Sequence, residues 1–309
     1  MKTLIPRCAA ALGLAMASPA FALNILVSND DGLSSNVKAL YDALKAAGHD
    51  VIVSVPCTNQ SGRGGAAVQY SKTVIVVDND KTQLDANGGG CRSGAARIGD
   101  PANGPMLKEG FTNGDYHYVH GTPVQATNHG LDVLAPARWG KAPDLVLSGP
   151  NEGENAGPIV IYSGTVGNVQ VASMRGVPAI AVSAGNDTRG DATANNPYSA
   201  AVAQLTVKLL DTLRAKAGSG PLLPKGVALN VNIPPAPTAN LPFAFSRQGS
   251  FNLYDANGGG TPTAAQAEDE GVVSRTKVAV TAMQTGIGFE HRPAAQQWLR
   301  LHLGELFGQ

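Results

Sequence analysis

The chain has 309 residues, which is enough for one large domain with a substantial hydrophobic core. Hydrophobic residues make up 43% of it, and 23 basic residues balance 23 acidic ones, so the formal net charge is zero. This balance argues against binding to a nucleic-acid duplex, which selects basic surfaces, and no segment after residue 22 approaches the length and apolarity of a membrane span.

The first 22 residues have the organisation of a secretory signal peptide. Lys2 and Arg7 precede an apolar, alanine-rich stretch at 8–17, and the small-x-small triplet at 20–22 fits cleavage after Ala22. Cleavage removes two of the 23 basic residues and none of the 23 acidic ones, which leaves a formal charge of about −2. We therefore expect a periplasmic or secreted protein.

From residue 23 onward, short apolar runs alternate with amphipathic segments, the order typical of an α/β protein with a doubly wound, mostly parallel sheet. The first unit is a strand at 23–28 and a helix that Ser34 or Ser35 caps and Gly48 ends. Its apolar stripe is expected to contain Val37, Leu40, Tyr41, Leu44 and Ala47. Further strands are expected at 51–55, 74–77, 116–119, 144–147, 179–183 and 228–231, and further helices after 123, after 165 and at 199–215.

Two regions depart from this alternation. Residues 78–115 are rich in Asn, Gly and Asp, which indicates a surface insertion that Cys91 would tether to the body. Residues 236–309 begin in Pro- and Gly-rich sequence and end in a strand at 278–280 and an amphipathic segment at 294–303, so they are interpreted as an extension of a core at 23–235.

The two cysteines that remain after cleavage are Cys57 and Cys91. An even pair in an exported protein is compatible with a disulfide, and the alternative is two unpaired thiols. Their spacing has no zinc-ligand pattern.

Two adjacent carboxylates, Asp30 and Asp31, stand where the first strand stops, and Gly32 permits a turn there. Inside a strand, two neighbouring ionised carboxylates would be costly, whereas at its carboxyl end they can share a divalent cation. The alternative is an ordinary exposed Asp-Gly turn.

Polar side chains follow two other strands at the same kind of position. Ser61 lies in the loop after the second strand, and Asn151 follows the strand at 144–147. Because the carboxyl ends of parallel strands converge, these oxygens would join Asp30 and Asp31 in a hard ligand set that favours Mg²⁺, Mn²⁺ or Ca²⁺. The alternatives are that Ser61 braces a loop and that Asn151 forms an Asx turn.

Residues 162–165, Tyr-Ser-Gly-Thr, offer hydroxyl groups and a backbone N–H where a helix begins. Helix N-termini attract anions, although Ser163 or Thr165 can also be a simple helix cap. A cation beside an anion site indicates phosphate chemistry, because the cation neutralises phosphate charge and activates water.

Together these segments resemble the SurE family of survival-protein nucleotidases, also called stationary-phase acid phosphatases. The resemblance extends over about residues 24–235 outside the insertion and weakens toward the carboxyl end. The segments that carry it are Ser28 to Gly32, Asn59 to Gly62, Gly121-Thr122-Pro123, the Ser148 to Gly157 segment with Asn151 and Asn155, Tyr162 to Val166, Gly176 to Ser183 and, more distantly, Glu270 to Ser274.

The resemblance implies a Rossmann-like core and metal-dependent hydrolysis of nucleoside 5′- and possibly 3′-monophosphates. It implies one divalent cation per subunit held by Asp30, Asp31, Ser61 and Asn151. We expect Asp30 or Asp31 to orient or deprotonate the attacking water, and the alternative is a covalent phosphoenzyme. The phosphate contacts that it implies come from Asn29, Asn155, Ser163, Gly164 and Thr165. It also implies that the carboxyl-terminal extension builds a homodimer or homotetramer.

Several features depart from the family pattern: the signal peptide, the 78–115 insertion, Cys57 after Pro56, and Pro150 in the turn before Asn151. They leave all the proposed ligands in place. Two rival functions share the signal peptide and the α/β character, namely an exported solute-binding protein without turnover and a metal-dependent hydrolase of another ester.

Overall fold

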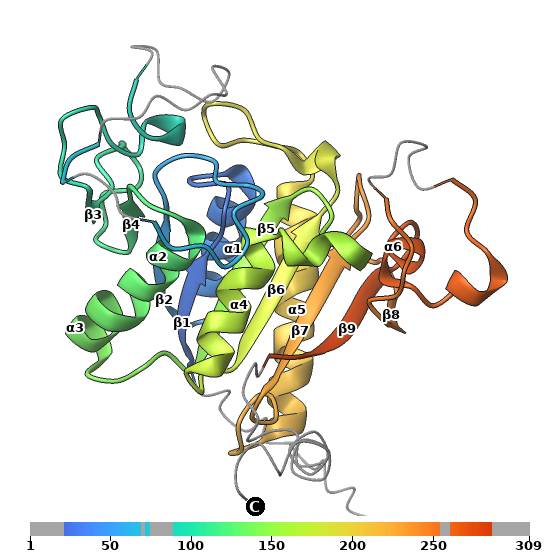
Figure 1. Cartoon of the computed structure of the whole chain (residues 1–309). Coiled ribbons are helices and arrows are strands. Elements are labelled where there is room, and N and C mark those ends of the chain that lie inside the picture. Colours follow the sequence, from blue (N-terminus) through green and yellow to red (C-terminus); the bar gives the residue numbers. More distant parts are fainter. Residues whose placement is uncertain (1–21, 69–71, 75–88, 254–259, 286–309) are drawn as a thin grey trace, which may run out of the picture.

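The computed structural model describes residues 22–68, 72–74, 89–253 and 260–285 of the chain. They form an α/β fold around a nine-stranded sheet with strand order β3-β4-β2-β1-β5-β6-β7-β9-β8, so the predicted fold class is confirmed (Figure 1). The strands are β1 (Asn24–Ser28), β2 (Asp50–Pro56), β3 (Asn103–Pro105), β4 (Tyr116–Val119), β5 (Leu145–Glu152), β6 (Ala179–Ala184), β7 (Val227–Ile233), β8 (Phe243–Ser246) and β9 (Val278–Gln284).

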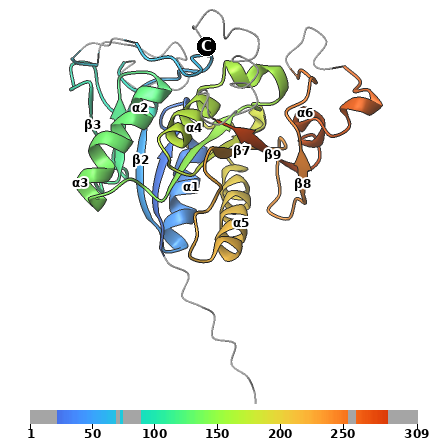
Figure 2. The same ribbon diagram turned by 60° about the horizontal axis from the view of Figure 1, so that its bottom comes forward.

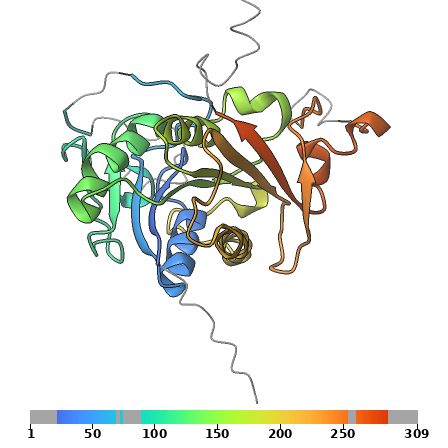
Figure 3. The same ribbon diagram turned by 90° about the horizontal axis from the view of Figure 1, so that it is seen from below.

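Helices cover both faces of the sheet. The α-helices are α1 (Ser35–Ala46), α2 (Pro123–His129), α3 (Ala135–Trp139), α4 (Gly164–Met174), α5 (Ser199–Ala217) and α6 (Glu270–Val273), and a π-helical turn, η3 (Gly130–Leu134), joins α2 to α3. The 3₁₀ turns are η2 (Arg92–Gly94), η4 (Gly157–Ile161), η5 (Asn186–Thr188) and η6 (Ala264–Gln266). Figures 2 and 3 show α1 and α5 on one side of the sheet and α2 and α4 on the other.

The alternation of side chains along β1 builds the two cores. Ile25 and Val27 pack into the cluster that contains the inner faces of α1 and α5, whereas Leu26 packs into the cluster beneath α4. Successive strand residues point to opposite faces, so one apolar strand serves both layers. Strands β1, β2, β4, β5, β6 and β7 are parallel, which brings their carboxyl ends to one edge of the sheet.

Helix α1 begins and ends close to the predicted positions. The hydroxyl of Ser34 accepts a hydrogen bond from the backbone N–H of Val37 and caps the helix. The buried stripe contains Val37, Leu40, Tyr41 and Leu44 as predicted, but Ala47 is exposed, because it is the C-cap rather than a residue of the last turn. Gly48 follows with a φ of +86°, which favours glycine.

Strand β5 is longer than the sequence predicts. Its pairing with β6 shifts register between Ser148 and Asn151 and then continues through Glu152. The turn expected at Pro150, just before Asn151, is therefore wrong. The polypeptide bulges at Gly149-Pro150, whose peptide bond is cis, and places Asn151 inside the strand.

The described part of the predicted insertion, 89–115, packs against the core. A disulfide joins Cys91 to Cys57, and Ala95, Ala96 and Met106 lie in the larger hydrophobic cluster. Strand β3 pairs antiparallel with β4 at the sheet edge. Of the strand predicted at 74–77, only Val74 lies among the described residues, and it is buried beside the isolated bridge between Thr73 and Pro101.

The described part of the predicted extension also joins the sheet. Strand β9 pairs antiparallel with β7, and β8 pairs with β9 and forms the edge. The predicted signal peptide at 1–22, except Ala22, and the amphipathic segment at 294–303 lie outside the described residues. Within the described part of the chain, each helix is too short or too polar to cross a bilayer.

Candidate active site

The turn after β1 presents its two carboxylates in a fixed arrangement. The side-chain amide of Asn29 donates to the carbonyl oxygen of Gly32 at 2.7 Å, and the Gly32 N–H donates back to Asn29 Oδ1 at 3.1 Å. Gly32 has a φ of +83°, and a Cβ there would lie 3.0 Å from the carbonyl oxygen of Pro56. Glycine is therefore required, and Asp30 and Asp31 are held in a buried turn.

Asp30 faces the N-terminus of α4. Its Oδ1 accepts a hydrogen bond from Thr165 Oγ1 at 2.8 Å, and a Cβ on Gly164 would lie 2.7 Å from Asp30 Cβ. Burial and the neighbouring charge of Asp31 raise the pKa of Asp30 to about 7, although the bonds from Thr165 and the Gly164 backbone lower it. The ionised form of Asp30 is thus costly in the ligand-free chain and would gain from a nearby cation.

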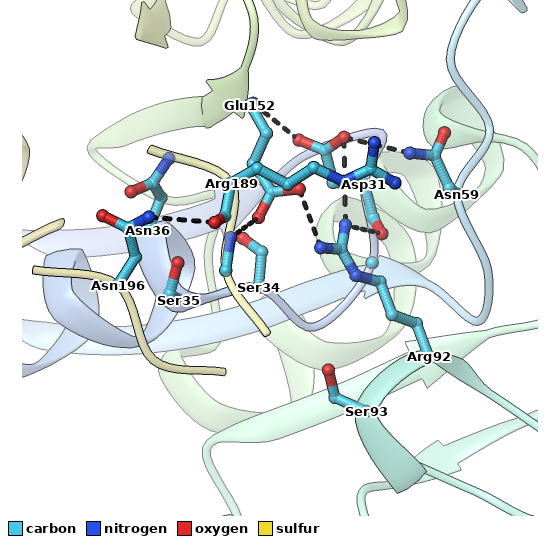
Figure 4. A network of polar contacts seen from close by, with 12 residues as sticks. Asp31, Ser34, Ser35, Asn36, Asn59, Arg92, Ser93, Glu152, Arg189 and Asn196 are labelled. Carbon is cyan, nitrogen blue, oxygen red and sulfur yellow. Dashed lines mark hydrogen bonds and ion pairs between the residues drawn. The ribbon is translucent and has the colours of Figure 1, made fainter. Parts of the chain in front are cut away.

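Asp31 is held by groups from three other segments (Figure 4). The backbone N–H of Glu152 donates to Asp31 Oδ2 at 3.0 Å, and Asn59 Nδ2 donates to Asp31 Oδ1 at 3.3 Å. The guanidinium of Arg92 lies 4.0 Å from Oδ1 and forms an ion pair with Glu152. Burial and the charge of Asp31 raise the pKa of Glu152 to about 7.

Asn151 carries a buried carbonyl oxygen that lacks a hydrogen-bond partner within the described part of the chain. Its amide nitrogen donates to the carbonyl oxygen of Gly153 at 2.9 Å, which leaves Oδ1 unsatisfied. Glu152, the next residue, bonds to Asp31, so this oxygen belongs to the same end of the sheet. A buried acceptor of this kind is costly unless something satisfies it, and a hard cation fits it together with the two carboxylates.

The connection of Ser61 to the two carboxylates is indirect. It is exposed, and its backbone N–H donates to Oδ1 of Asn59, the residue whose amide reaches Asp31. Among the described residues, groups of three or more His, Cys, Asp or Glu suited to a metal are absent. A site here depends on amide and hydroxyl oxygens besides the carboxylates, as the sequence predicts.

Four of the five predicted phosphate contacts lie together. Asn155 Nδ2 donates to Thr165 Oγ1 at 3.3 Å and to Ser183 Oγ at 2.8 Å, and the Ser163 hydroxyl caps α4 by accepting from the Val166 N–H at 3.1 Å. Gly164 lies between them in the first turn of α4.

The predicted phosphate contact of Asn29 stays a prediction. Both polar ends of its amide bond to Gly32, so in this structure the side chain shapes the turn after β1. Asparagine commonly closes turns in this way, and the sequence alone cannot separate that role from ligand binding.

Three polar residues that the sequence analysis missed complete the site. Arg92 and Glu152 flank Asp31, and Asn168 Nδ2 donates to the Asn29 carbonyl oxygen and to Ser148 Oγ. Two signals in the sequence could have identified Arg92 and Glu152. Glu152 directly follows Asn151, and Arg92 directly follows Cys91. The site as a whole combines hard oxygen ligands with a helix N-terminus, an arrangement suited to a cation and a phosphate.

Most of the described core matches a known protein family. The survival protein SurE family matches residues 25–254. An acid phosphatase of Yarrowia lipolytica is 37% identical over 68% of this chain and 56% of its own length. A 5′-nucleotidase SurE of Desulfovibrio desulfuricans is 35% identical over 52% and 49%, and a 5′/3′-nucleotidase SurE of Proteus mirabilis is 31% identical over 74% and 70%.

The solved structure of SurE protein from Aquifex aeolicus has the same fold, with a TM-score of 0.58, 23% identity and coverage of 90% of this chain and 99% of that one. The chain spans about half the length of the first two relatives above. The match to residues 25–254 nevertheless covers β2 to β8, β1 from Ile25, helices α1 to α5 and the whole candidate site; β9 and α6 lie beyond it. The chain belongs to the SurE family.

Proposed function

We propose that this protein is a divalent-metal-dependent phosphomonoesterase that hydrolyses nucleoside monophosphates to nucleosides and phosphate. The relatives named as nucleotidases and as an acid phosphatase support the substrate class. The observation that carries the proposal is the buried Oδ1 of Asn151, which has no hydrogen-bond partner among the described residues and lies at the same end of the sheet as the buried carboxylates Asp30 and Asp31.

Asp30, Asp31, Asn151 and Ser61 would hold the cation, which is Mg²⁺, Mn²⁺ or Ca²⁺. When bound, this ion supplies Lewis acidity that neutralises negative charge on the phosphate and promotes the ionisation of water. Ser61 lies in the exposed loop after β2, whereas the other three residues are buried.

The first turn of α4 would bind the phosphate. Gly164 brings backbone N–H groups close to Asp30. The Thr165 hydroxyl now donates to Asp30 and the Asn155 amide to Thr165 and Ser183, and a bound phosphate would take over some of these donors. The Ser163 hydroxyl, while its oxygen accepts from Val166, can still donate to a phosphate oxygen. Asp30 or Asp31 would orient the attacking water and hold its proton.

We also propose export and self-association. The signal-peptide pattern at 1–22 supports a periplasmic or secreted location, and the Cys57–Cys91 disulfide suits an oxidising compartment. Phe245, 95% exposed on the edge strand β8, supports a homodimer or homotetramer formed through the carboxyl-terminal layer.

A substrate panel tests the proposed activity. Purified protein is incubated with nucleoside 5′- and 3′-monophosphates, short polyphosphate and carboxylic esters, each with Mn²⁺ and with excess chelator, and product release is measured. Release of phosphate from nucleoside monophosphates that chelator abolishes supports the proposal. Tight nucleotide binding without turnover would favour the solute-binding function, and turnover confined to carboxylic esters would favour the other hydrolase.

A further inference from the structure

Arg92 is a fully buried arginine next to the candidate metal site. Only 1% of its surface is exposed. A buried guanidinium is costly unless charged and hydrogen-bonding partners surround it, so its contacts define its role.

The two ends of the Arg92 guanidinium bond to different residues of the site (Figure 4). Nη2 lies 2.7 Å from Glu152 Oε2, and Nη1 donates to the carbonyl oxygen of Asp31 at 2.9 Å while lying 4.0 Å from Asp31 Oδ1. Glu152 in turn bonds Asp31 Oδ2 through its backbone N–H. Arg92 therefore ties the turn after β1 to the end of β5, the two segments that carry Asp31 and Asn151.

Arg92 is set in place by a covalent link beside it. The preceding residue, Cys91, is joined by the disulfide to Cys57, which directly follows β2, and the Arg92 N–H donates to the Cys57 carbonyl oxygen at 2.7 Å. Ser93 Oγ donates to the Leu33 carbonyl oxygen at 3.1 Å. A Cβ on Gly32 would lie 3.5 Å from Arg92 Cβ, so the arginine packs directly on the turn.

We propose that Arg92 is a positioning residue for Asp31, set in place by the Cys57–Cys91 disulfide, and that it orients Asp31 for cation binding. The inference rests on the proposed function, because it assigns Asp31 to the metal. Arg92 does not contact the substrate or the cation in this account. It acts by fixing the main chain and the carboxylate of Asp31 with a forked donor that lysine cannot reproduce.

A role as mere counter-charge makes the opposite prediction. If Arg92 only balanced Glu152 and Asp31, its removal would leave a more negative site and Mn²⁺ would bind as tightly or more tightly. If Arg92 positions Asp31, Mn²⁺ would bind less tightly despite the added negative charge. Direct measurement of Mn²⁺ affinity separates the two roles without reference to catalysis.

The experiment is a calorimetric titration of the metal-free mature chain with Mn²⁺, with circular dichroism as a check of folding. The variants are Arg92→Gln, Arg92→Lys and Cys57→Ser/Cys91→Ser. Arg138→Gln is the matched control, because Arg138 also pairs with two carboxylates, Asp50 and Asp115, but outside the site. Phosphate release with a nucleoside monophosphate is measured in parallel.

We expect Mn²⁺ affinity and kcat to fall about 10- to 100-fold in Arg92→Gln, as is typical when a group that orients a metal ligand is lost. Arg92→Lys should fall between Arg92→Gln and wild type, the double serine variant should weaken Mn²⁺ binding, and Arg138→Gln should match wild type. Wild-type or tighter Mn²⁺ affinity in folded Arg92→Gln would overturn the inference.

If Arg92→Gln does not fold, the Mn²⁺ affinities of Arg92→Lys and of the double serine variant test the inference. Wild-type Mn²⁺ affinity in both Arg92→Lys and the double serine variant would overturn the inference, and a weakened affinity in both would support it. Failure of the wild-type chain to bind Mn²⁺ would overturn the proposed function and this inference together, whereas unchanged affinity in the variants overturns this inference alone.

Discussion

At the scale of single residues, Asn151 shows most clearly how polar groups are arranged for a ligand. Its amide nitrogen is bonded to Gly153 and its carbonyl oxygen is buried without a partner among the described residues. An unsatisfied buried acceptor costs about 1–3 kcal/mol of folding free energy. In the proposed function the bound cation satisfies this oxygen together with Asp30 and Asp31.

Asn151→Ala should therefore reduce activity without reducing the stability of the metal-free protein. Loss of the bond to Gly153 and relief of the unsatisfied oxygen offset each other, so the free energy of unfolding should change by less than about 1 kcal/mol. Phosphate release with Mn²⁺ should fall at least about 100-fold. Urea unfolding in chelator and a phosphate-release assay measure the two quantities.

Asn113→Ala is the control for this substitution, because Asn113 also makes side-chain hydrogen bonds, to Tyr41 and to the Asp115 N–H, but away from the site. It should retain wild-type turnover. Full activity in Asn151→Ala would contradict the assignment of Asn151 to the cation.

Among these residues, some positions follow from the sequence and others do not. Asp30 and Asp31 follow from an apolar strand that stops at two carboxylates, because a strand interior would not tolerate them. Arg92 does not follow, because its place depends on a disulfide and on a 3₁₀ turn far from β1 in sequence. The role of Asn29 does not follow either, because a short amide that closes its own turn has the same sequence pattern as one that binds a ligand.

At the scale of elements, the contact between α4 and the turn after β1 determines the geometry of the site. Gly164 allows the helix N-terminus to approach Asp30 so closely that a Cβ would lie 2.7 Å from both Asp30 Cβ and Pro123 Cγ. The positive end of the α4 dipole is thus directed toward the carboxylate and the proposed phosphate site.

Gly164→Ala should push α4 away from Asp30. Overpacking of this kind costs about 1–3 kcal/mol, and turnover should fall because Thr165 and the helix N-terminus move together. Thermal unfolding and phosphate-release kinetics measure both effects. Gly65→Ala is the matched control, since a Cβ there would have no atom of the described residues within 4 Å, and it should behave like wild type. A Gly164→Ala protein with wild-type kcat and KM would contradict the account.

The elements themselves were largely predictable where local pattern and tertiary packing agree. The stripe and the Ser34 cap of α1 follow from residue spacing and capping chemistry. The extension of β5 through Asn151 and Glu152 could not be predicted in this way. The pair Gly149-Pro150 is typical of the end of a strand, and the strand continues beyond the bulge only because it pairs with β6.

At the scale of the whole molecule, a buried carboxylate connects the carboxyl-terminal layer to the site. Glu270, at the start of α6, accepts hydrogen bonds from the Gly157 N–H at 2.9 Å and from Asn230 Nδ2 at 3.0 Å. Asn230 also donates to the carbonyl oxygen of Asn155, whose amide bonds Thr165. The described part of 236–309 is therefore integrated with the core, which its Pro- and Gly-rich composition did not indicate.

Glu270 should make stability depend on pH. Burial raises its pKa from 4.5 to about 7, so between these values the folded chain keeps a proton that the unfolded chain releases. The resulting stabilisation is complete below pH 4.5 and is lost as the pH rises through 7. In Glu270→Gln the contribution of this residue to the pH dependence disappears.

Thermal unfolding at pH 5 and pH 8 in chelator tests this linkage. Asp30 and Glu152 titrate in the same window, so the comparison is between variants: the loss of Tm with rising pH should be smaller in Glu270→Gln than in wild type by at least about 2–4 °C, which corresponds to about 1 kcal/mol. Glu268→Gln, an exposed position on the same segment, is the control. An equal or steeper loss of Tm in Glu270→Gln would contradict the assignment.

The most direct test of the account is stoichiometric reconstitution of the metal-free chain with Mn²⁺ while phosphate release from a nucleoside monophosphate is recorded. With a metal-dependent mechanism, the rate should rise in proportion to Mn²⁺ and stop rising at about one equivalent per chain, and Asp31→Asn should stay at the metal-free rate throughout. Full hydrolysis by the metal-free chain, or a wild-type rate in Asp31→Asn, would contradict the metal-dependent mechanism.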